Sequence, residues 1–219
     1  MILRYVLANS LEAYNEWRKD MSFTDNFGNP KGLLGRMMLV SMDREHLPMA
    51  RWALGQIGLP RDGVVADIGC GGGYNIKRML EMTENTRFVG IDISDESVKK
   101  AKKINSAEIG RRVKIIQGSA EKLPFRNDSI KLVTAFETVF FWKEPEKGFS
   151  EIYRSLESGG SLAVINNYGA PNVDWEKKVP CMTRYTAEQI SDMLKKAGFA
   201  DISVSKKDTL FLVIGRKIR

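Results

Sequence analysis

The sequence has few of the residues that hold metals and form disulfides. Its 219 residues include two cysteines, Cys70 and Cys181, and a single histidine, His46. These are too few for a Cys/His zinc cluster, so we expect no metal. They also give no disulfide framework, which is typical of proteins from a reducing compartment.

A long hydrophobic run is missing as well. The stretch MILRYVLANSLEAYNEW at the N-terminus has a short apolar segment, which is broken by Arg4 and followed directly by polar residues. It matches neither the hydrophobic region of a signal peptide nor the roughly 20 apolar residues of a membrane span. The sequence therefore predicts a cytoplasmic chain without a membrane span.

Negative charge is in the minority, since the formal net charge is +7. A basic protein raises the question of a nucleic-acid partner. The positive charge is spread along the chain, however, and its densest runs, such as Lys99–Lys103 and Lys195–Lys196, fall on what we predict to be solvated helix faces. The composition therefore does not favour nucleic acid as the partner.

From residue 63 onward, short apolar runs alternate with helical periods, which is typical of βαβ units. A chain of this length with 43% hydrophobic residues suits one domain with a full core. The predicted strands are Val64–Ile68, Arg87–Asp92, Val113–Gln117, Ile130–Phe136, Ser161–Asn166, Asp201–Ser205 and Leu210–Gly215. With helices in the gaps, they predict a doubly wound, seven-stranded α/β sheet.

Local signals predict where several helices begin and how the chain ends. Ser94 is a good N-cap, and Thr186 with Gln189 has the capping-box pattern. The connection Lys206–Thr209 is too short for a crossover helix, so the last two strands must pair antiparallel. Residues 1–62 are predicted to be helical and to precede a main domain of residues 63–219.

The first strand ends in the glycine-rich stretch A-D-I-G-C-G-G-G-Y at residues 66–74. Glycines this dense allow the backbone to approach a ligand closely. Tyr74 stands where the dinucleotide fingerprint has its third glycine, which argues against an NAD-type site. Asp92 ends the next strand, where a carboxylate can accept hydrogen bonds from both hydroxyls of a ribose. Together they predict a nucleoside ligand without a pyrophosphate.

The same segments resemble class I S-adenosylmethionine-dependent methyltransferases. D-I-G-C-G-G-G and the following V-G-I-D-I-S resemble two motifs of that family, and Q-G-S-A-E-K-L-P-F at 117–125 is similar to its G-D-A-x-x-L-P-F. The resemblance spans residues 64–215. It implies a Rossmann-like, mostly parallel sheet of order 3-2-1-4-5-7-6, with the last strand antiparallel and an N-terminal helical lid. It also implies S-adenosylmethionine as the cofactor and S-adenosylhomocysteine as its product.

The resemblance further implies which residues contact the cofactor. The implied set is Asp67, Gly69, Cys70 and Gly71 at the methionine end, Asp92 and Ile93 at the ribose and adenine, Ser119, Ala120 and Glu121 at the adenine edge, and Phe136 and Glu137 near the sulfonium. The family often has Asp where this chain has Ser119. A hydroxyl can still accept a hydrogen bond from the adenine amino group, so we expect weaker adenine recognition without its loss.

Methyl transfer needs alignment and water exclusion more than a catalytic triad, and no triad is evident. Glu137 and His46 are the candidate bases. Glu137 could instead cap or contact the cofactor's ammonium, and His46 could be a packing histidine. Cys181 in V-P-C-M is similar to the Pro-Cys nucleophile of cytosine-C5 methyltransferases, but it follows the fifth predicted strand where that nucleophile follows the fourth.

The substrate side is predicted to be apolar. Three consecutive aromatics, Phe140, Phe141 and Trp142, cannot all point inward, so at least one should face the cavity. The candidate pocket residues are Phe141, Trp142 and Met38. The Asn/Asp-Pro-Pro-aromatic loop of nucleobase-amino methyltransferases is replaced by Ala135–Thr138, which lacks proline.

These patterns resemble small-molecule methyltransferases of the ubiquinone/menaquinone-biosynthesis type. They predict methyl transfer to a small, partly hydrophobic metabolite by in-line displacement. Two alternatives stay open: an enzyme acting on RNA or another macromolecule, and a non-catalytic cofactor-binding subunit. An NAD-linked enzyme is opposed by Tyr74 and by the antiparallel end of the sheet.

Overall fold

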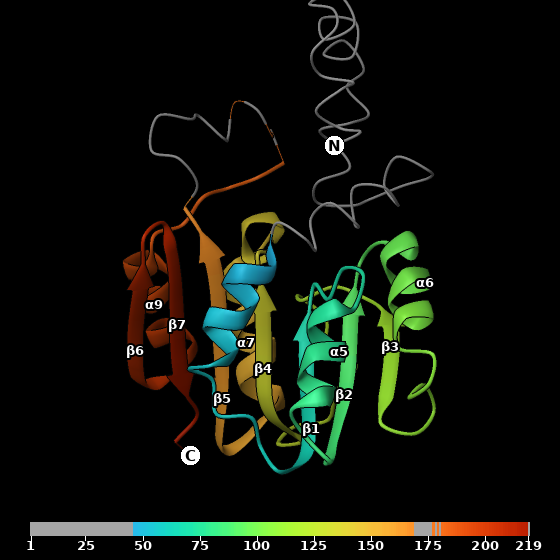
Figure 1. The fold of residues 1–219 in the computed structure, drawn as a ribbon. Coiled ribbons are helices and arrows are strands. Elements are labelled where there is room, and N and C mark those ends of the chain that lie inside the picture. The colour runs from blue at the N-terminus through green and yellow to red at the C-terminus, as the bar shows by residue number, and fades with distance from the viewer. Residues whose placement is uncertain (1–45, 169–176, 178, 180, 219) are drawn as a thin grey trace, which may run out of the picture.

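A computed structural model describes residues 46–168, 177, 179 and 181–218. Seven strands form one sheet of order β3-β2-β1-β4-β5-β7-β6, as predicted (Figure 1). The strands are β1 (Asp62–Ile68), β2 (Asn85–Asp92), β3 (Val113–Gln117), β4 (Ile130–Phe136), β5 (Leu156–Asn167), β6 (Ala200–Lys207) and β7 (Leu210–Arg216). Strands β1 to β5 pair in parallel, whereas β7 is antiparallel to both β5 and β6. The predicted Rossmann-like sheet is confirmed, whereas the expected N-terminal helical lid falls largely on residues 1–45, outside the described part.

Helices cover both faces of the sheet. They are α5 (Tyr74–Glu81), α6 (Asp95–Ile104), α7 (Pro145–Ser155) and α9 (Ala187–Ala197), with a further helical stretch at residues 46–54. In Figure 1 the 46–54 stretch, α5 and α6 lie in front of the sheet, and α7 and α9 lie behind it. Each layer has its own core, because successive strand residues point to opposite faces. Val164 belongs to the core with α7 and α9, and its neighbour Ile165 to the other.

The predicted caps are present. The Ser94 hydroxyl accepts a hydrogen bond from the Ser97 N–H at the start of α6. At α9 the Thr186 hydroxyl accepts from the Gln189 N–H at 3.1 Å, and Gln189 Oε1 accepts from the Thr186 N–H at 2.8 Å. Such a cap satisfies N–H groups that a helix start leaves without partners, which explains why these starts were predictable.

The fifth strand differs from the prediction at its start. It begins at Leu156, five residues before the predicted Ser161, and Gly159 and Gly160 lie inside it. The reason is a pairing with the end of the chain: Gly159 N–H donates to Lys217 O at 2.7 Å, and Lys217 N–H donates to Gly160 O at 2.9 Å. A contact so distant in sequence leaves no local signal.

The 46–54 stretch packs onto the sheet through Met49, Ala50, Ala53 and Leu54, all of them buried. The division into a segment 1–62 and a domain 63–219 stays a prediction, because residues 1–45 lie outside the described part. No helix in the described ranges has the length and apolar character needed to cross a bilayer.

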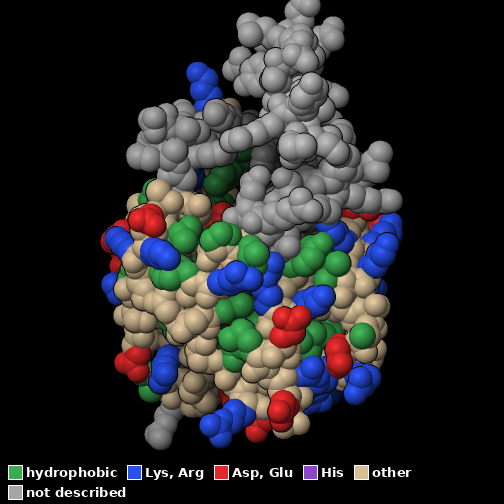
Figure 2. Space-filling model, viewed as in Figure 1, with side chains coloured by type: hydrophobic (Ala, Val, Ile, Leu, Met, Phe, Trp, Pro, Cys, Tyr) green, Lys and Arg blue, Asp and Glu red, His purple; other side chains and the backbone are tan. Residues whose placement is uncertain are grey.

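Charge is spread over the surface. On the face shown in Figure 2, Lys and Arg side chains alternate with acidic, apolar and other groups and do not gather into one patch. Several positive charges are paired within a helix, as in Lys99 with Asp95 and Lys195 with Asp192. The face in Figure 2 therefore does not show the continuous basic patch that binding of an extended nucleic acid requires.

Candidate functional site

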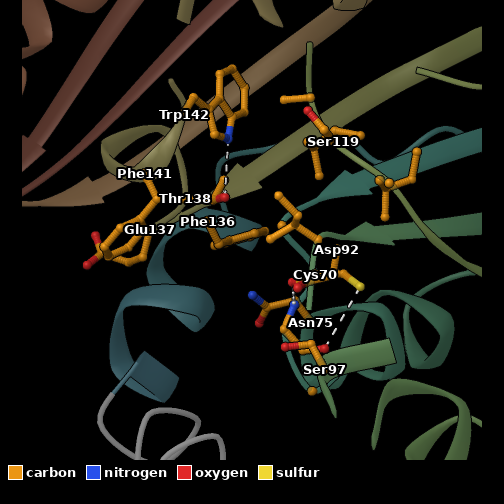
Figure 3. Close-up of a pocket in the computed structure, with 18 of the residues that line it drawn as sticks. Cys70, Asn75, Asp92, Ser97, Ser119, Phe136, Glu137, Thr138, Phe141 and Trp142 are labelled. Carbon is orange, nitrogen blue, oxygen red and sulfur yellow. Dashed lines mark hydrogen bonds between the residues drawn. The ribbon is translucent and has the colours of Figure 1, made fainter. Parts of the chain in front are cut away.

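A cavity of about 410 Å³ lies at the carboxyl ends of β1, β2 and β4, where ligands bind in open α/β sheets (Figure 3). Its size falls within the range of small-molecule sites. It is lined by residues of the loop after β1 and of α5, of the end of β2, of the 118–121 loop, of the 136–144 link between β4 and α7, and of the 46–54 stretch.

The glycine loop adopts a backbone that other residues disfavour. Gly69, Gly71 and Gly73 have φ angles of 71°, 51° and 76°. The N–H groups of Gly69 and Cys70 both donate to Ile91 O, at 2.7 and 3.0 Å, which holds the loop against β2. A Cβ at Gly69 would lie 2.0 Å from Thr138 Oγ1, so the loop also touches the link after β4.

Asp92 is fixed at the tip of β2. Its Oδ2 accepts from the Gly71 N–H at 2.8 Å and its Oδ1 from the Ser94 N–H at 2.9 Å. Burial raises the pKa of the carboxyl, and the two backbone hydrogen bonds oppose that rise. Each oxygen keeps a further lone pair, so the carboxylate can also accept from a ligand hydroxyl.

The wall beside Asp92 contains a polar group that the sequence motifs did not point to. Ser97 lines the cavity, and its hydroxyl lies next to Asp92, where it helps to lower the pKa of that carboxyl. A hydroxyl both donates and accepts hydrogen bonds, so it can also accept one from a ligand. Left-handed glycines, a fixed carboxylate and a neighbouring hydroxyl together fit the sugar and tail of a nucleoside cofactor.

Asp67 does not line the cavity, although the resemblance implied that it would contact the cofactor. It is buried, and its Oδ1 accepts from the Thr134 hydroxyl at 2.7 Å. Burial raises its pKa to about 7; the Thr134 hydrogen bond lowers it, and the charge of Asp92 adds to the rise. Asp67 therefore lies inside the sheet and not in the cavity wall.

This raised pKa predicts a pH effect on stability. A buried acid of this kind stabilises the fold while it is protonated, and that contribution is lost as pH rises from about 4 to about 7. The amide side chain of an Asp67→Asn variant cannot ionise. Over this window the free energy of unfolding of the wild type should therefore fall relative to that of the variant. The difference should change by up to about 1.4 kcal/mol per pH unit.

Urea unfolding of both proteins from pH 4 to 8 measures this difference. The same substitution at Asp192, an exposed residue of α9, controls for the loss of one surface charge. A gap between Asp67→Asn and wild type that is constant with pH would contradict the account.

Glu137 directly follows β4 and also has a left-handed backbone, with φ of 53°. For a residue with a Cβ this conformation is strained, and such strain concentrates at functional sites. Its Oε1 accepts from the Asn167 N–H at the end of β5. Burial raises its pKa to about 8, and the Asn167 hydrogen bond offsets only part of that rise. The structure brings Glu137 and His46, from different layers, into the same cavity.

The three consecutive aromatics separate as the 3-10 helix η1 (Val139–Phe141) turns the chain. Phe140 is buried, whereas Phe141 and Trp142 line the cavity together with Phe136. The Trp142 indole N–H donates to Thr138 Oγ1 at 3.3 Å, as Figure 3 shows. At least one of the three faces the cavity, as expected.

At the other end of the cavity, Ile93 has 52% of its surface exposed, which leaves an apolar face for a flat ring. The Ser119 hydroxyl donates to Glu121 Oε2, and Glu121 Oε1 accepts from the Lys143 N–H at 3.0 Å. Burial favours a higher pKa for Glu121, but these hydrogen bonds outweigh it and the pKa is lowered. A ligand that hydrogen-bonds Ser119 would share it with Glu121.

The structure also places the other residues predicted for the site. Those that line the cavity are Gly69, Cys70, Gly71 and Ala120. Burial raises the pKa of the Cys70 thiol, which disfavours the reactive thiolate. Cys181 is exposed and is not part of the wall. Met38 lies outside the described residues. Within the described ranges no three His, Cys, Asp or Glu side chains are grouped to hold a metal ion.

Other lining residues were missed by the sequence reasoning. They are Met49, Tyr74, Asn75, Arg78, Ser97, Thr138, Lys143 and Glu144, together with Ile68, Gly72, Ile91 and Gly118. Asn75 and Arg78 could have been found, because they follow the glycine loop on the first turns of α5. No sequence motif marks Thr138 or Met49, so neither could be predicted to line the cavity.

Comparison with known proteins gives concordant results. A family model described as a methyltransferase domain matches residues 66–164. The uncharacterized methyltransferase YdaC of Bacillus subtilis is 29% identical over 172 residues, which are 76% of this chain and 88% of that protein. The chloroplastic 2-methyl-6-phytyl-1,4-hydroquinone methyltransferase 2 of Oryza sativa is 26% identical over 65% of this chain, but the match covers only 40% of that protein.

Solved structures share the fold. A chain from the complex between the Haloferax volcanii Trm112 methyltransferase activator and a methyltransferase has a TM-score of 0.73 at 22% identity, covering 83% of this chain and 94% of its own. Phosphoethanolamine N-methyltransferase 2 of Haemonchus contortus, bound to phosphomonomethylethanolamine and S-adenosylhomocysteine, has a TM-score of 0.74 at 18% identity, covering 92% of this chain and 61% of its own. At these identities the likeness shows the fold alone.

Proposed function

Since this chain is a class I S-adenosylmethionine-dependent methyltransferase, we propose that it methylates a small, partly hydrophobic metabolite. The observation that carries the proposal is the part of the cavity that follows β4, where three aromatic side chains, Phe136, Phe141 and Trp142, line it together with the acid Glu137. Such a lining suits a compact apolar molecule with one polar group.

The described residues fit the cofactor. We assign the ribose to Asp92 and Ser97, the adenine to Ile93 and Ala120, and the amino-acid tail to the backbone of Gly69 and Gly71. The assignment is supported by the fixed Asp92 carboxylate, the exposed Ile93 side chain and the left-handed glycines. When bound, the cofactor supplies an electrophilic methyl group. The protein's part is to orient the acceptor and to exclude water.

Glu137 is the group proposed to take the acceptor's proton. A base works best when its pKa lies near the working pH, and burial raises the pKa of Glu137 to about 8. His46 lines the same cavity and is the second candidate. Phe141 and Trp142 are proposed to close the wall against water on the same side.

Ligand-dependent melting tests the cofactor assignment. S-adenosylmethionine and S-adenosylhomocysteine should each raise the melting temperature, because a ligand that binds only the folded state stabilises it. The gain is about 2.7 kcal/mol at a hundred times the dissociation constant. NAD should give no shift, since Tyr74 stands in place of the third fingerprint glycine. A shift with NAD and none with S-adenosylmethionine would contradict the assignment.

Transfer of a labelled methyl group in a metabolite extract tests the acceptor class. With the purified protein alone, label should appear in small molecules that partition into organic solvent. Label on RNA or protein, with a rate that falls steeply as salt rises, would favour the macromolecular alternative. Absence of transfer despite cofactor binding would favour a subunit that needs a partner. The structural relative from the Trm112 complex makes that outcome worth testing.

A further inference from the structure

Glu137 holds its carboxyl in the cavity wall with few partners. Among the described residues, the Asn167 N–H donates to Oε1, and Oε2 receives no hydrogen bond. The backbone N–H of Glu137 donates to Ile165 O at 2.8 Å, so the residue is tied to β5 at two points. These two hydrogen bonds to β5 fix the position of Glu137 in the cavity wall, next to the lining aromatics Phe136 and Phe141.

Within the described residues, burial and the Asn167 hydrogen bond set the pKa of this carboxyl, and no cation lowers it. The other charged or titratable groups of the cavity are His46 from the 46–54 stretch, Arg78 from α5, Asp92 from β2, Glu121, Lys143 and Glu144. Tyr74 of α5 and Cys70 of the glycine loop also line it, and Tyr168 follows β5. A half-buried acid without a neighbouring cation is costly to ionise, so a ligand that brings a positive charge favours the ionised carboxylate.

We propose that Glu137 distinguishes the positively charged methyl donor from its uncharged product. The idea rests on the proposed function, because it requires the donor's sulfonium to lie near the end of β4. Binding of the sulfonium favours the ionised carboxylate, and the acid's proton passes to solvent. After transfer the product is a neutral thioether, the attraction is gone, and the acid takes up a proton again. Glu137 thereby favours donor binding and product release.

The size of the effect follows from the electrostatics of a half-buried acid. An opposite charge within about 4–6 Å lowers the pKa of an acid by about 1–3 units. The preference for donor over product should therefore rise at least about tenfold as pH increases from 6 to 9, across the pKa of about 8 of the ligand-free protein.

Isothermal titration calorimetry tests this without an acceptor substrate. S-adenosylmethionine and S-adenosylhomocysteine are titrated separately at pH 6, 7.5 and 9, in buffers that differ in ionisation enthalpy, so that affinity and proton release are both measured. In the wild type the ratio of the two dissociation constants should change with pH, and the donor should release more protons at pH 7.5 than the product does.

Two variants complete the experiment. Glu137→Gln should remove the pH dependence of the ratio except for the part due to the ligands' own amino groups, which is common to all the proteins. Glu146→Gln makes the same change at an exposed acid in the first turn of α7 that does not line the cavity, and it should behave like the wild type.

The outcomes separate the inference from the function on which it rests. If both ligands bind the wild type with the same pH dependence and proton release, the inference is wrong and the proposed function stands. If neither ligand binds, both are overturned. The wild-type titrations alone decide this, even if Glu137→Gln does not fold.

Discussion

Replacing Asp92 with alanine should weaken the binding of S-adenosylmethionine by about ten- to a thousandfold. Each hydrogen bond to a charged acceptor contributes about 1.5–3 kcal/mol, and each 1.4 kcal/mol is a factor of ten in affinity, so the range covers the loss of one or of both ribose hydroxyl bonds. The carboxylate also orders the loop, because it accepts from the Gly71 and Ser94 N–H groups at 2.8 and 2.9 Å. The variant loses the proposed ribose contact and leaves two backbone donors without their partner.

Calorimetric titration with S-adenosylhomocysteine measures this loss without turnover. Asp95→Ala is the matched control, because Asp95 lies three residues further on, at the exposed start of α6, and does not line the cavity. It should keep the wild-type affinity. An unchanged affinity in Asp92→Ala would show that the ribose is held elsewhere and that the nucleoside assignment is wrong.

The sheet was predictable because its strands are short apolar runs bounded by turns. Val113–Gln117 and Ile130–Phe136 were predicted to the residue, and β1 and β2 began two residues earlier than expected. The helix starts followed from their caps. The early start of β5 was not predictable, because it depends on Lys217 from the end of the chain.

The candidate site was predictable where a motif fixes the backbone, and less so where a side chain finds its partner through the fold. Gly69, Gly71 and Asp92 lie where the motif implies. Asp67 belongs to the same motif, but its carboxylate bonds to Thr134, which is 67 residues away in sequence and lies on the neighbouring strand β4. Only the register of β1 against β4 reveals that pair.

The aromatic link shows a second kind of limit. The sequence indicated that Phe140, Phe141 and Trp142 cannot share one face, but not which of them is buried. The η1 turn decides this, and it also brings Thr138 under the glycine loop. Neither the turn nor the left-handed backbone of Glu137 has a sequence signal, since both depend on the packing between β4 and β5.

A Gly69→Ala variant should lose cofactor binding more completely than any other single methyl addition in the loop. The φ of 71° already disfavours alanine, by about 1–2 kcal/mol. The added Cβ would also lie 2.0 Å from Thr138 Oγ1 and 2.5 Å from Thr138 Cβ, distances that require the backbone to move. We expect the affinity for S-adenosylhomocysteine to fall by at least about a hundredfold and the melting temperature to drop.

Two further variants separate the clash from the backbone strain. Gly110→Ala has a similar φ of 79°, but nothing lies within 4 Å of its Cβ, so it should cost about 1 kcal/mol of stability and leave affinity unchanged. Adding Thr138→Gly to Gly69→Ala removes the clashing atoms and should restore part of the affinity. If Gly110→Ala reduced binding as much as Gly69→Ala, general destabilisation would explain the loss. The close approach of the glycine loop to the link after β4 would then not be what shapes the site.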